Sequence, residues 1–394
     1  MLNVGIIGAG VGGLSVGMML KNIGCKVTIF EKLAKSTSDG VGIQISANGI
    51  RVLRAYGLEN EVAELGDFPD FVDCVNGHNG KKLAKIPLGK IAEKLYGAGF
   101  YQFHRADFIS LLQKENLRLG VSIFYGTKVL AIDHDVDGAT VTTDEGSCSR
   151  FDLIVAADGI NSITRNQIFE TNPPVFLKQV AYRTVISTDD LPEAFAFGQT
   201  RLFLGSGKHV VSYPIRKGSL VNFVFCSEFN SYCQEIWNRE VNPEEIRDKF
   251  SEFVGLKEVL NNIHSARKWG LFKHTFLDSW HRNRVVLLGD ACHPILPYLA
   301  QGATQAIEDA HELCNRVMES FENQNLEQEL ARYAKNRIPR VRRVGRASRL
   351  NAKLFHLKNP ILVFIFHLSL RILGSTYPKL LLRRFSWIYA GGPS

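Results

Sequence analysis

The feature that most constrains the fold of this chain is a glycine-rich turn near its start, placed between two short apolar runs. Residues 3–7 form the first run and residues 26–30 the second, and residues 14–21 between them have the composition of a helix. The turn holds three glycines in a GxGxxG pattern: Gly8, Gly10 and Gly13. Glu31 ends the second run. Strand, glycine turn, helix, strand and acid together predict a βαβ unit that binds a dinucleotide.

Each part of this motif has a physical role. Gly8 permits the tight turn, Gly10 lets the backbone approach a pyrophosphate, and Gly13 lets the helix pack close to the strand. The helix start offers free N–H groups and a partial positive charge to phosphates. The Glu31 carboxylate can accept hydrogen bonds from ribose hydroxyls and disfavours a 2′-phosphate at this site. The motif alone leaves FAD and NAD both open, and a plain glycine-rich turn is the simpler alternative.

Two later turns have the same character. Asp158-Gly159 follows an apolar run over residues 153–156, and Gly289-Asp290 follows another over residues 284–288. An aspartate at a strand end can accept from a ribose or ribitol hydroxyl, and the adjacent glycine removes a side chain that would collide with the ligand. Each turn alone is also a common way to end a strand.

A block of further predicted strands interrupts the nucleotide-binding domain. Asp137-Gly138 joins two alternating runs and predicts a hairpin. Three further strands are predicted at residues 180–185, 209–213 and 221–226, and helix from about Gln301. We therefore expect an α/β fold with a Rossmann-like domain (1–175 and 276–330), interrupted by a mostly antiparallel sheet domain (176–275) that binds substrate. A helical C-terminal segment (331–394) follows.

The three turns, in this order and spacing, resemble the single-component flavin-dependent aromatic hydroxylases of the para-hydroxybenzoate hydroxylase class. The resemblance covers nearly the whole chain. Within that class, residues 289–303 read most like salicylate 1-hydroxylase and 3-hydroxybenzoate 6-hydroxylase. The resemblance implies FAD as cofactor and NADH or NADPH as co-substrate, without deciding between the two nicotinamides.

The resemblance also implies which residues hold FAD. Asp158 and Gly159, with Ser162 and Arg165, fit the DGxxSxxR motif of the class, and Arg105 fits the arginine aimed at the FAD phosphates. The full expected set is Gly8, Gly10, Gly13, Glu31, Lys32, Gly42, Arg105, Asp158, Gly159, Gly289, Asp290, Pro297, Gly302 and Ala303. Relatives often carry Arg, Gly and Asn where this chain has Lys32, Ala300 and Thr304. No metal site is expected.

Hydroxylation in this class proceeds through a flavin hydroperoxide, which attacks an electron-rich ring such as a phenolate. The site therefore needs a group that accepts a phenol proton in a dry pocket. His209 and Tyr213 are four residues apart on a predicted strand, so they share one face. The resemblance implies that His209, Tyr213 and Tyr101 are catalytic residues that line the substrate pocket. An ordinary sheet histidine and core tyrosines are the alternatives.

We expect an FAD-dependent NAD(P)H monooxygenase that uses O2 to hydroxylate a small phenolic or related aromatic substrate. The alternatives are the same chemistry on a larger ring system, such as a polyketide, a quinone precursor or an antibiotic, or a flavin-binding redox protein without oxygenase activity. Aromatic stimulation of NAD(P)H oxidation discriminates between oxygenase and redox protein.

Cysteine usage bears on location. The seven cysteines are scattered without CxxC spacing, so we expect them to be reduced and mostly buried, in a cytoplasmic protein without disulfides. The apolar N-terminus lacks the basic start of a signal peptide. No apolar stretch reaches 18 residues, which argues against a spanning helix.

The charge is unevenly distributed. Residues 331–394 carry 14 Lys and Arg, and no Asp or Glu follows Glu329. Basic and apolar side chains together suit the anionic surface of a membrane, which would place the protein at its inner face. The alternative is a helical segment packed on the acidic body. Nucleic acid is not expected as a partner, and monomer and dimer both stay open.

Overall fold

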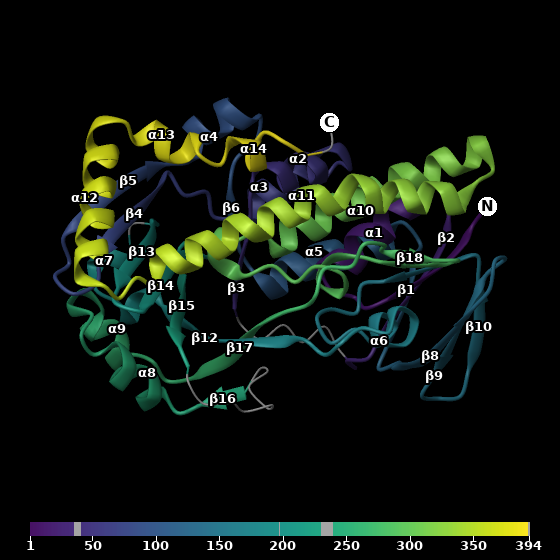
Figure 1. The fold of residues 1–394 in the computed structure, drawn as a ribbon, viewed down its shortest axis with the longest axis horizontal. Helices are drawn as coiled ribbons and strands as arrows, with labels where there is room; N and C mark the ends of the chain where they lie inside the picture. The colour runs from purple at the N-terminus through teal and green to yellow at the C-terminus, as the bar shows by residue number, and fades with distance from the viewer. Residues whose placement is uncertain (35–40, 197, 230–238, 393–394) are drawn as a thin grey trace.

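The computed structural model describes residues 1–34, 41–196, 198–229 and 239–392. One of its sheets has six strands in the order β18-β19-β11-β1-β2-β7. Strands β1, β2 and β18 of this sheet are labelled on the right of Figure 1. β1 pairs in parallel with β2 and β11, and β11 pairs in parallel with β19. The strands are β1 (Asn3–Ile7), β2 (Lys26–Glu31), β7 (Ser122–Tyr125), β11 (Leu153–Ala156), β18 (His281–Arg282) and β19 (Val285–Leu287). The three turns singled out in the sequence therefore follow neighbouring parallel strands, at the same edge of the sheet.

Long helices cover this sheet. They are α1 (Val11–Asn22), α5 (Arg105–Arg118), α10 (Gly302–Asn323) and α11 (Leu326–Phe355). α1 packs against both α5 and α10, and α11 packs against α10. Val4, Ile6, Leu14 and Met18 are fully buried in the resulting core. The parallel pairing of β1 with β2, with α1 between them in sequence, confirms the predicted βαβ unit. β1 carries apolar side chains on both faces, so it needs cover from both sides.

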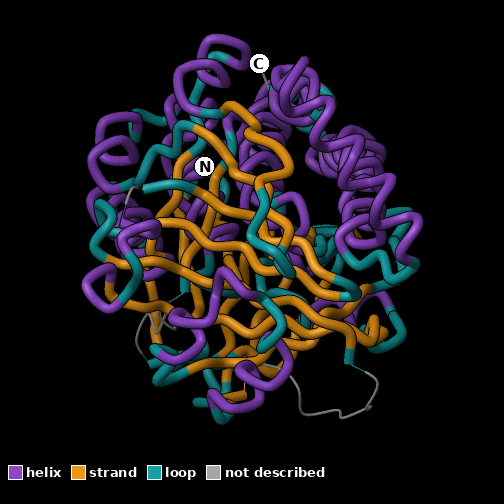
Figure 2. Tube along the Cα trace, turned by 90° about the vertical axis from the view of Figure 1, so that its left-hand side faces the viewer, coloured by secondary structure: helices purple, strands orange, loops and turns teal. Residues whose placement is uncertain are grey.

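An eight-stranded sheet stands beside this domain, in the order β16-β17-β12-β15-β14-β13-β4-β5. Figure 2 shows the strands of the molecule in orange, with helices around them. Its neighbours pair antiparallel, except β13 and β4. The strands are β4 (Phe71–Asn76), β5 (Lys82–Pro87), β12 (Val175–Ser187), β13 (Thr200–Gly205), β14 (Lys208–Ile215), β15 (Leu220–Glu228), β16 (Arg239–Val241) and β17 (Ala266–Lys273). The three strands predicted in this block are present. β4 and β5 come from outside residues 176–275, so the sheet is wider than the predicted domain.

Smaller elements complete the fold. β8 (Val129–His134), β9 (Ala139–Thr143) and β10 (Cys148–Phe151) form a three-stranded sheet, and β3 (Gly42–Ile45) pairs with β6 (Tyr101–His104). The predicted hairpin joins β8 to β9. The Asp135 Oδ1 atom closes its turn by accepting from the Asp137 and Gly138 amides, both at 2.9 Å. The shorter helices are α2 (Ala47–Ala55), α3 (Glu59–Leu65), α4 (Gly89–Tyr96), α6 (Ile163–Phe169), α7 (Glu193–Ala196), α8 (Pro243–Phe250) and α9 (Lys257–Asn261).

One part of the basic C-terminal segment is packed on the body of the protein, and another part is exposed. Arg337 donates to Asp309 and Glu308, each at 2.7 Å, and Arg340 donates to Glu308 at 2.6 Å. For α11, the structure therefore agrees with the alternative of a helical segment packed on acidic residues of the body. The segment continues with α12 (Pro360–Thr376), α13 (Pro378–Arg383) and α14 (Ser386–Tyr389), and no residue of α12 is buried.

Among the described residues, no single helix is long and apolar enough to cross a membrane; α11 and α12 reach that length and hydropathy only as a pair bent by 113°. The described cysteines are unpaired, and all of them except Cys148 are buried. Cys233 lies outside the described residues.

Candidate active site

A cavity of about 520 Å³ lies between the turns that follow β1, β11 and β19 and one face of the eight-stranded sheet. Gly10, Gly159 and Asp290 line it from the three predicted turns, and His209 and Tyr213 line it from β14. Segments about 280 residues apart thus share one cleft. The predicted cofactor turns and the predicted substrate residues belong to the same site.

The glycines of the first turn differ in what surrounds them. A Cβ on Gly8 would lie 2.5 Å from the Ala157 carbonyl oxygen, and one on Gly13 would lie 1.9 Å from the Gly8 carbonyl oxygen. A Cβ on Gly10 or Gly302 would meet no atom within 4 Å, because both residues face the cavity. Gly8 and Gly13 are therefore required by packing, whereas Gly10 and Gly302 border open space in the cavity, as expected of glycines that let a cofactor approach the backbone.

Two helices start at this cradle. α1 begins after Gly10 and α10 begins at Gly302, close to the predicted start at Gln301. Neither N-cap side chain bonds the free amides of its helix. Both helix starts thus direct unsatisfied N–H groups and a partial positive charge at the cavity. That polarity suits a pyrophosphate at α1 and the electron-rich end of a reduced flavin at α10.

A buried arginine joins the second and third turns. Arg165 donates to the carbonyl oxygens of Ala291 and Cys292 at 3.2 and 3.0 Å, and to that of Thr275 at 2.5 Å. Asp158 accepts from the Thr164 amide and hydroxyl. Asp158 therefore holds the start of α6, and Gly159 is the member of this motif that lines the cavity.

The other acids of the predicted set differ in accessibility. The Asp290 side chain is exposed to the cavity, and desolvation by the surrounding protein raises the pKa of its carboxyl. The Glu31 carboxylate is already engaged: Oε2 accepts from the Ala9 amide at 2.7 Å and Oε1 from the Leu33 amide at 3.0 Å. Glu31 and Lys32 lie outside the cavity lining, which does include Gly42, Arg105, Gly289, Pro297 and Ala303.

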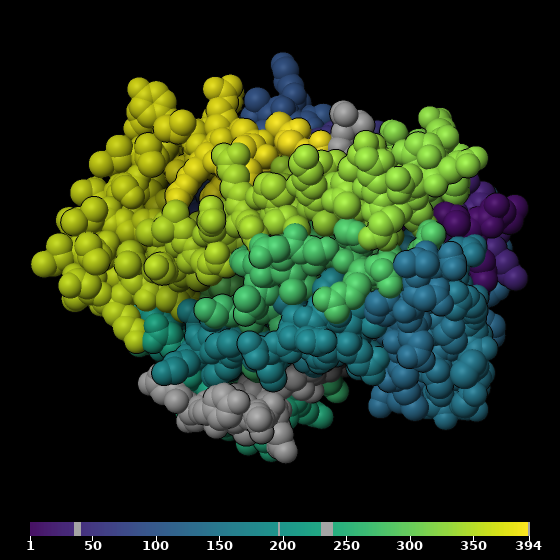
Figure 3. All heavy atoms as spheres, turned by 45° about the vertical axis from the view of Figure 1, so that its right-hand side comes forward, coloured from purple at the N-terminus to yellow at the C-terminus, as the bar shows by residue number. Residues whose placement is uncertain are grey.

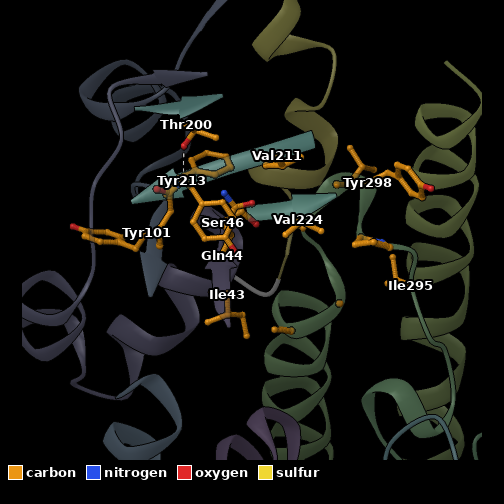
Figure 4. A pocket seen from close by; sticks show the side chains of 18 of the residues that line it. Ile43, Gln44, Ser46, Tyr101, Thr200, Val211, Tyr213, Val224, Ile295 and Tyr298 are labelled. Carbon is orange, nitrogen blue, oxygen red and sulfur yellow. Dashed lines mark hydrogen bonds between the residues drawn. The ribbon is translucent and has the colours of Figure 1, made fainter. Parts of the chain in front are cut away.

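The second wall of the cavity is one face of the large sheet. His209, Val211 and Tyr213 alternate along β14, and the pairing register places Val211 beside Val224 on β15 (Figure 4). The predicted shared face is therefore present. Gly42 allows β3 to approach, since a Cβ there would lie 2.5 Å from the Tyr213 ring. Tyr101 also lines the cavity, but its ring lies apart from Tyr213 (Figure 4) and packs 5.2 Å from Phe68.

His209 belongs to a buried hydrogen-bonded chain that the sequence analysis missed. Its Nδ1 atom lies 2.9 Å from Nε2 of His356, at the end of α11. His356 Nδ1 lies 3.3 Å from the Gln179 amide nitrogen, and the Tyr298 hydroxyl donates to Gln179 Oε1 at 2.9 Å. Burial lowers the pKa of His209 well below its usual value and that of His356 to about 4. Both rings are therefore neutral at physiological pH.

Arg183 is a second residue without a local sequence signal. It lies on β12 beside Val224, lines the cavity, and has a buried Nε atom with no hydrogen-bond partner among the described residues. Its guanidinium carbon lies 5.3 Å from the Trp269 ring. A cation held in a largely apolar wall, with an unused donor, is suited to bind an anionic group.

His293 has a structural place behind the third turn. Its Nε2 atom bonds Asp309 Oδ2, which also accepts from the Gly289 amide at 3.2 Å, and Asp309 Oδ1 accepts from Arg337. Cys292, His293 and Asp309 are close enough to share an ion. Because both Asp309 oxygens are already hydrogen-bonded, the geometry explains this cluster as a brace for the Gly289-Asp290 turn.

Comparison with known proteins places these features in context. The family described as "FAD binding domain" matches residues 1–348. A 3-amino-4-hydroxybenzoate 2-monooxygenase of Streptomyces platensis is 32% identical over 355 residues, which cover 90% of this chain and 88% of that protein. The 3-hydroxybenzoate 6-hydroxylase 1 of Aquipseudomonas alcaligenes is 29% identical, with 98% and 97% covered. A salicylate hydroxylase solved with substrate has the same fold, with a TM-score of 0.82 and 24% identity over 100% of this chain and 98% of that one.

Proposed function

This chain belongs to the FAD-binding family of flavin-dependent aromatic monooxygenases, and we propose that it hydroxylates a phenolic ring that carries a carboxylate. The resemblance drawn from the three turns is confirmed by the family match and by the hydroxybenzoate hydroxylases similar to this chain. FAD is the cofactor, and the class uses NADH or NADPH together with O2. Membership in a family of oxygenases argues against the alternative of a redox protein without oxygenase activity.

The observation that carries the substrate class is Arg183. Its buried Nε atom has no partner among the residues that the structure describes, and its guanidinium belongs to the wall that also holds His209 and Tyr213. A carboxylate on the substrate would supply the missing acceptor in a charge-assisted pair. The two hydroxybenzoate enzymes similar to this chain are named for substrates with a carboxylate, which agrees with this assignment.

Bound FAD supplies the reduced flavin that activates O2, and the protein supplies position and polarity. Gly10 and Gly302 leave room for the cofactor, and the starts of α1 and α10 favour its negative charges. Asp290 offers a carboxyl to the ribityl hydroxyls. The assignment of Glu31, Lys32 and Asp158 to direct contacts with FAD stays a prediction from the resemblance.

The histidine pair is suited to hold the substrate as its phenolate. The Gln179 amide nitrogen is a donor, so His356 Nδ1 accepts from it and the proton of the neutral His356 ring lies on Nε2. His356 Nε2 then donates to His209 Nδ1, which leaves the His209 proton on Nε2, the nitrogen that a bound ring can meet. We therefore assign His209 as a donor to the phenolic oxygen, rather than as the acceptor of the phenol proton. Such a donor favours the electron-rich phenolate, whose proton is released to solvent on binding, without leaving a cation on the fully buried His209.

Tyr213 is a second donor. Burial raises the pKa of its hydroxyl, so the group stays protonated and can donate to a substrate oxygen. Tyr101 packs farther away, and we assign it to the outer wall of the pocket. We also propose a cytoplasmic location, which the buried, unpaired state of most described cysteines supports.

The test compares substituted phenols with Arg183 variants of the holoenzyme. We expect hydroxybenzoates to stimulate NAD(P)H oxidation and to be hydroxylated, and Arg183→Gln to raise their KM on the order of 100-fold. Arg183→Lys, which keeps the charge, should recover part of that loss. The same phenols without a carboxylate serve as the control. An equal effect of Arg183→Gln on both series would contradict the carboxylate assignment.

A further inference from the structure

The helix α12 is apolar on two opposite faces. Its inward side chains, including Phe366 and Leu370, pack on a buried cluster that contains Leu83 and Ala84 of β5. Gly374 permits close approach, because a Cβ there would lie 2.6 Å from the Ala84 Cβ. The outward side chains repeat at helical spacing and form one continuous stripe, the α12 face: Ile361, Leu362, Phe364, Ile365, Leu368 and Ile372.

These outward side chains are exposed to an unusual degree. The exposed fraction is 69% for Ile361, 66% for Phe364 and 54% for Ile365. A surface helix normally turns polar side chains to water, and a helix that is apolar all round is normally covered. Contiguous exposed apolar surface of this kind marks an interaction site. Helix α12 lies at one end of the molecule, far from the β8–β9 hairpin (Figure 1), and atoms of its colour form the left end of the space-filling view (Figure 3).

The surroundings of the α12 face are basic. Lys82 and Lys85 of β5 and Arg371 of α12 line a groove beside it, and exposed Lys379 follows at the start of α13. Lys82 pairs with Asp73, and Lys85 lies 3.4 Å from the centre of the Phe71 ring. Arg371 has no ion-pair partner among the described residues. The C-terminal segment itself contributes no acid, since none follows Glu329.

We propose that the α12 face, with its basic rim, docks on the anionic surface of a lipid bilayer. The exposed apolar side chains would enter the boundary between headgroups and acyl chains, and the basic side chains would meet lipid phosphates. A second copy of this chain is a less suitable occupant. A two-fold interface would bring two copies of the same basic surface into one contact, and the repulsion between them would oppose the apolar contact.

Docking would also bring the bilayer close to the site. Leu381, Leu382 and Phe385, which follow α12 directly, line the same cavity as His209. The bilayer contact thus lies next to one wall of the substrate pocket. The inference does not depend on which aromatic ring the enzyme hydroxylates.

The experiment is co-sedimentation of the full-length holoenzyme with two kinds of vesicle. One kind is phosphatidylcholine alone, and the other contains about one third phosphatidylglycerol. We expect the protein to pellet with the anionic vesicles, to stay largely in solution with the neutral ones, and to be released by high salt. Wild-type protein that pellets with neither kind would overturn the proposal.

Paired variants locate the contact. Phe364→Ser with Ile365→Ser should weaken binding to anionic vesicles by at least about tenfold, and Arg371→Gln should weaken it by several-fold. The matched control is Val136→Ser, which changes an apolar residue that is 70% exposed in the β8–β9 turn at the far end of the molecule. Unchanged flavin absorbance and thermal unfolding would show that the variants are folded.

Two other results count against the proposal. If the double variant binds vesicles as the wild type does, the contact lies elsewhere. If the wild type is a dimer in sizing experiments and the double variant is a monomer, a second copy covers the α12 face and the bilayer does not.

Discussion

The Nδ1 atom of His209 and the Nε2 atom of His356 lie 2.9 Å apart in a buried hydrogen bond that joins the substrate wall to the end of α11. The Tyr298 ring lies 5.2 Å from the His209 ring, and the Phe355 ring lies 5.3 Å from it. The pair is therefore held in one place by packing as well as by hydrogen bonding. Since His209 and Phe355 both line the cavity, this relationship makes the C-terminal segment part of the proposed active site.

Replacing His209 should separate chemistry from cofactor binding. We expect His209→Ala to slow hydroxylation on the order of 100-fold, because the phenolate oxygen of the substrate loses a hydrogen-bond donor. FAD affinity should not change, because the cofactor cradle lies on the other sheet. Rapid-reaction absorbance and FAD fluorescence titration measure the two quantities, and an unchanged rate would remove His209 from the mechanism.

His356 should act through His209. We expect His356→Gln to slow hydroxylation by about tenfold or more and to change the pH dependence of the rate, since His209 loses the imidazole donor that fixes its tautomer. His264→Gln, at an exposed histidine, is the control. A pH–rate profile that is the same for His356→Gln and the wild type would assign His356 to packing alone.

His356 should also make the native state sensitive to acid. Its pKa is about 4 in the folded protein, against about 6.5 in an unfolded chain. Between these values the unfolded state binds more protons, so the free energy of unfolding falls as the pH drops, by up to about 1.4 kcal/mol per pH unit. Urea unfolding at pH 7, 6 and 5 should show a shallower decline for His356→Gln. Parallel declines would contradict the assignment.

Gly10 and Gly13 should respond differently to a methyl group. Gly10 has an ordinary φ of −79° and open space around its Cβ position, so Gly10→Ala should leave the stability of the apoprotein unchanged. The added methyl would occupy cofactor space, and we expect FAD affinity to fall by at least about tenfold. Gly13→Ala, where the Cβ would meet the Gly8 carbonyl oxygen, should lower stability itself. Thermal unfolding of both apoproteins, with FAD titration, checks this contrast.

Arg165 should matter for stability as well as for the site. Arg165→Met would leave the Ala291, Cys292 and Thr275 carbonyl oxygens without their donor, and we expect a loss of about 2–4 kcal/mol. Lys335→Met, at an exposed position on α11, is the control and should change little. Denaturant titration measures both. If Arg165→Met is as stable as the control, Arg165 does not hold the two turns together.

Local patterns in the sequence predict the turns, but not their partners. The glycine spacing identifies the βαβ unit, and strand alternation places His209 and Tyr213 on one face, because both depend only on residues close in sequence. The position of Glu31 and Asp158 at strand ends does not predict their hydrogen bonds. Backbone amides already donate to the Glu31 carboxylate, and Asp158 accepts from the first turn of α6. His356 was missed because it meets His209 across 147 residues. β4 joins the large sheet by pairing with β13, for which no local signal exists.

The most direct test of the central claim follows the origin of the oxygen atom. Purified FAD-loaded enzyme is supplied with NAD(P)H, a hydroxybenzoate panel and ¹⁸O2, and the products are examined by mass spectrometry. We predict NAD(P)H oxidation stimulated by the aromatic compound and a hydroxylated product that carries one ¹⁸O atom from O2. A protein that binds no FAD, or that hydroxylates none of the aromatic acids, would contradict a shared site for flavin and aromatic carboxylate.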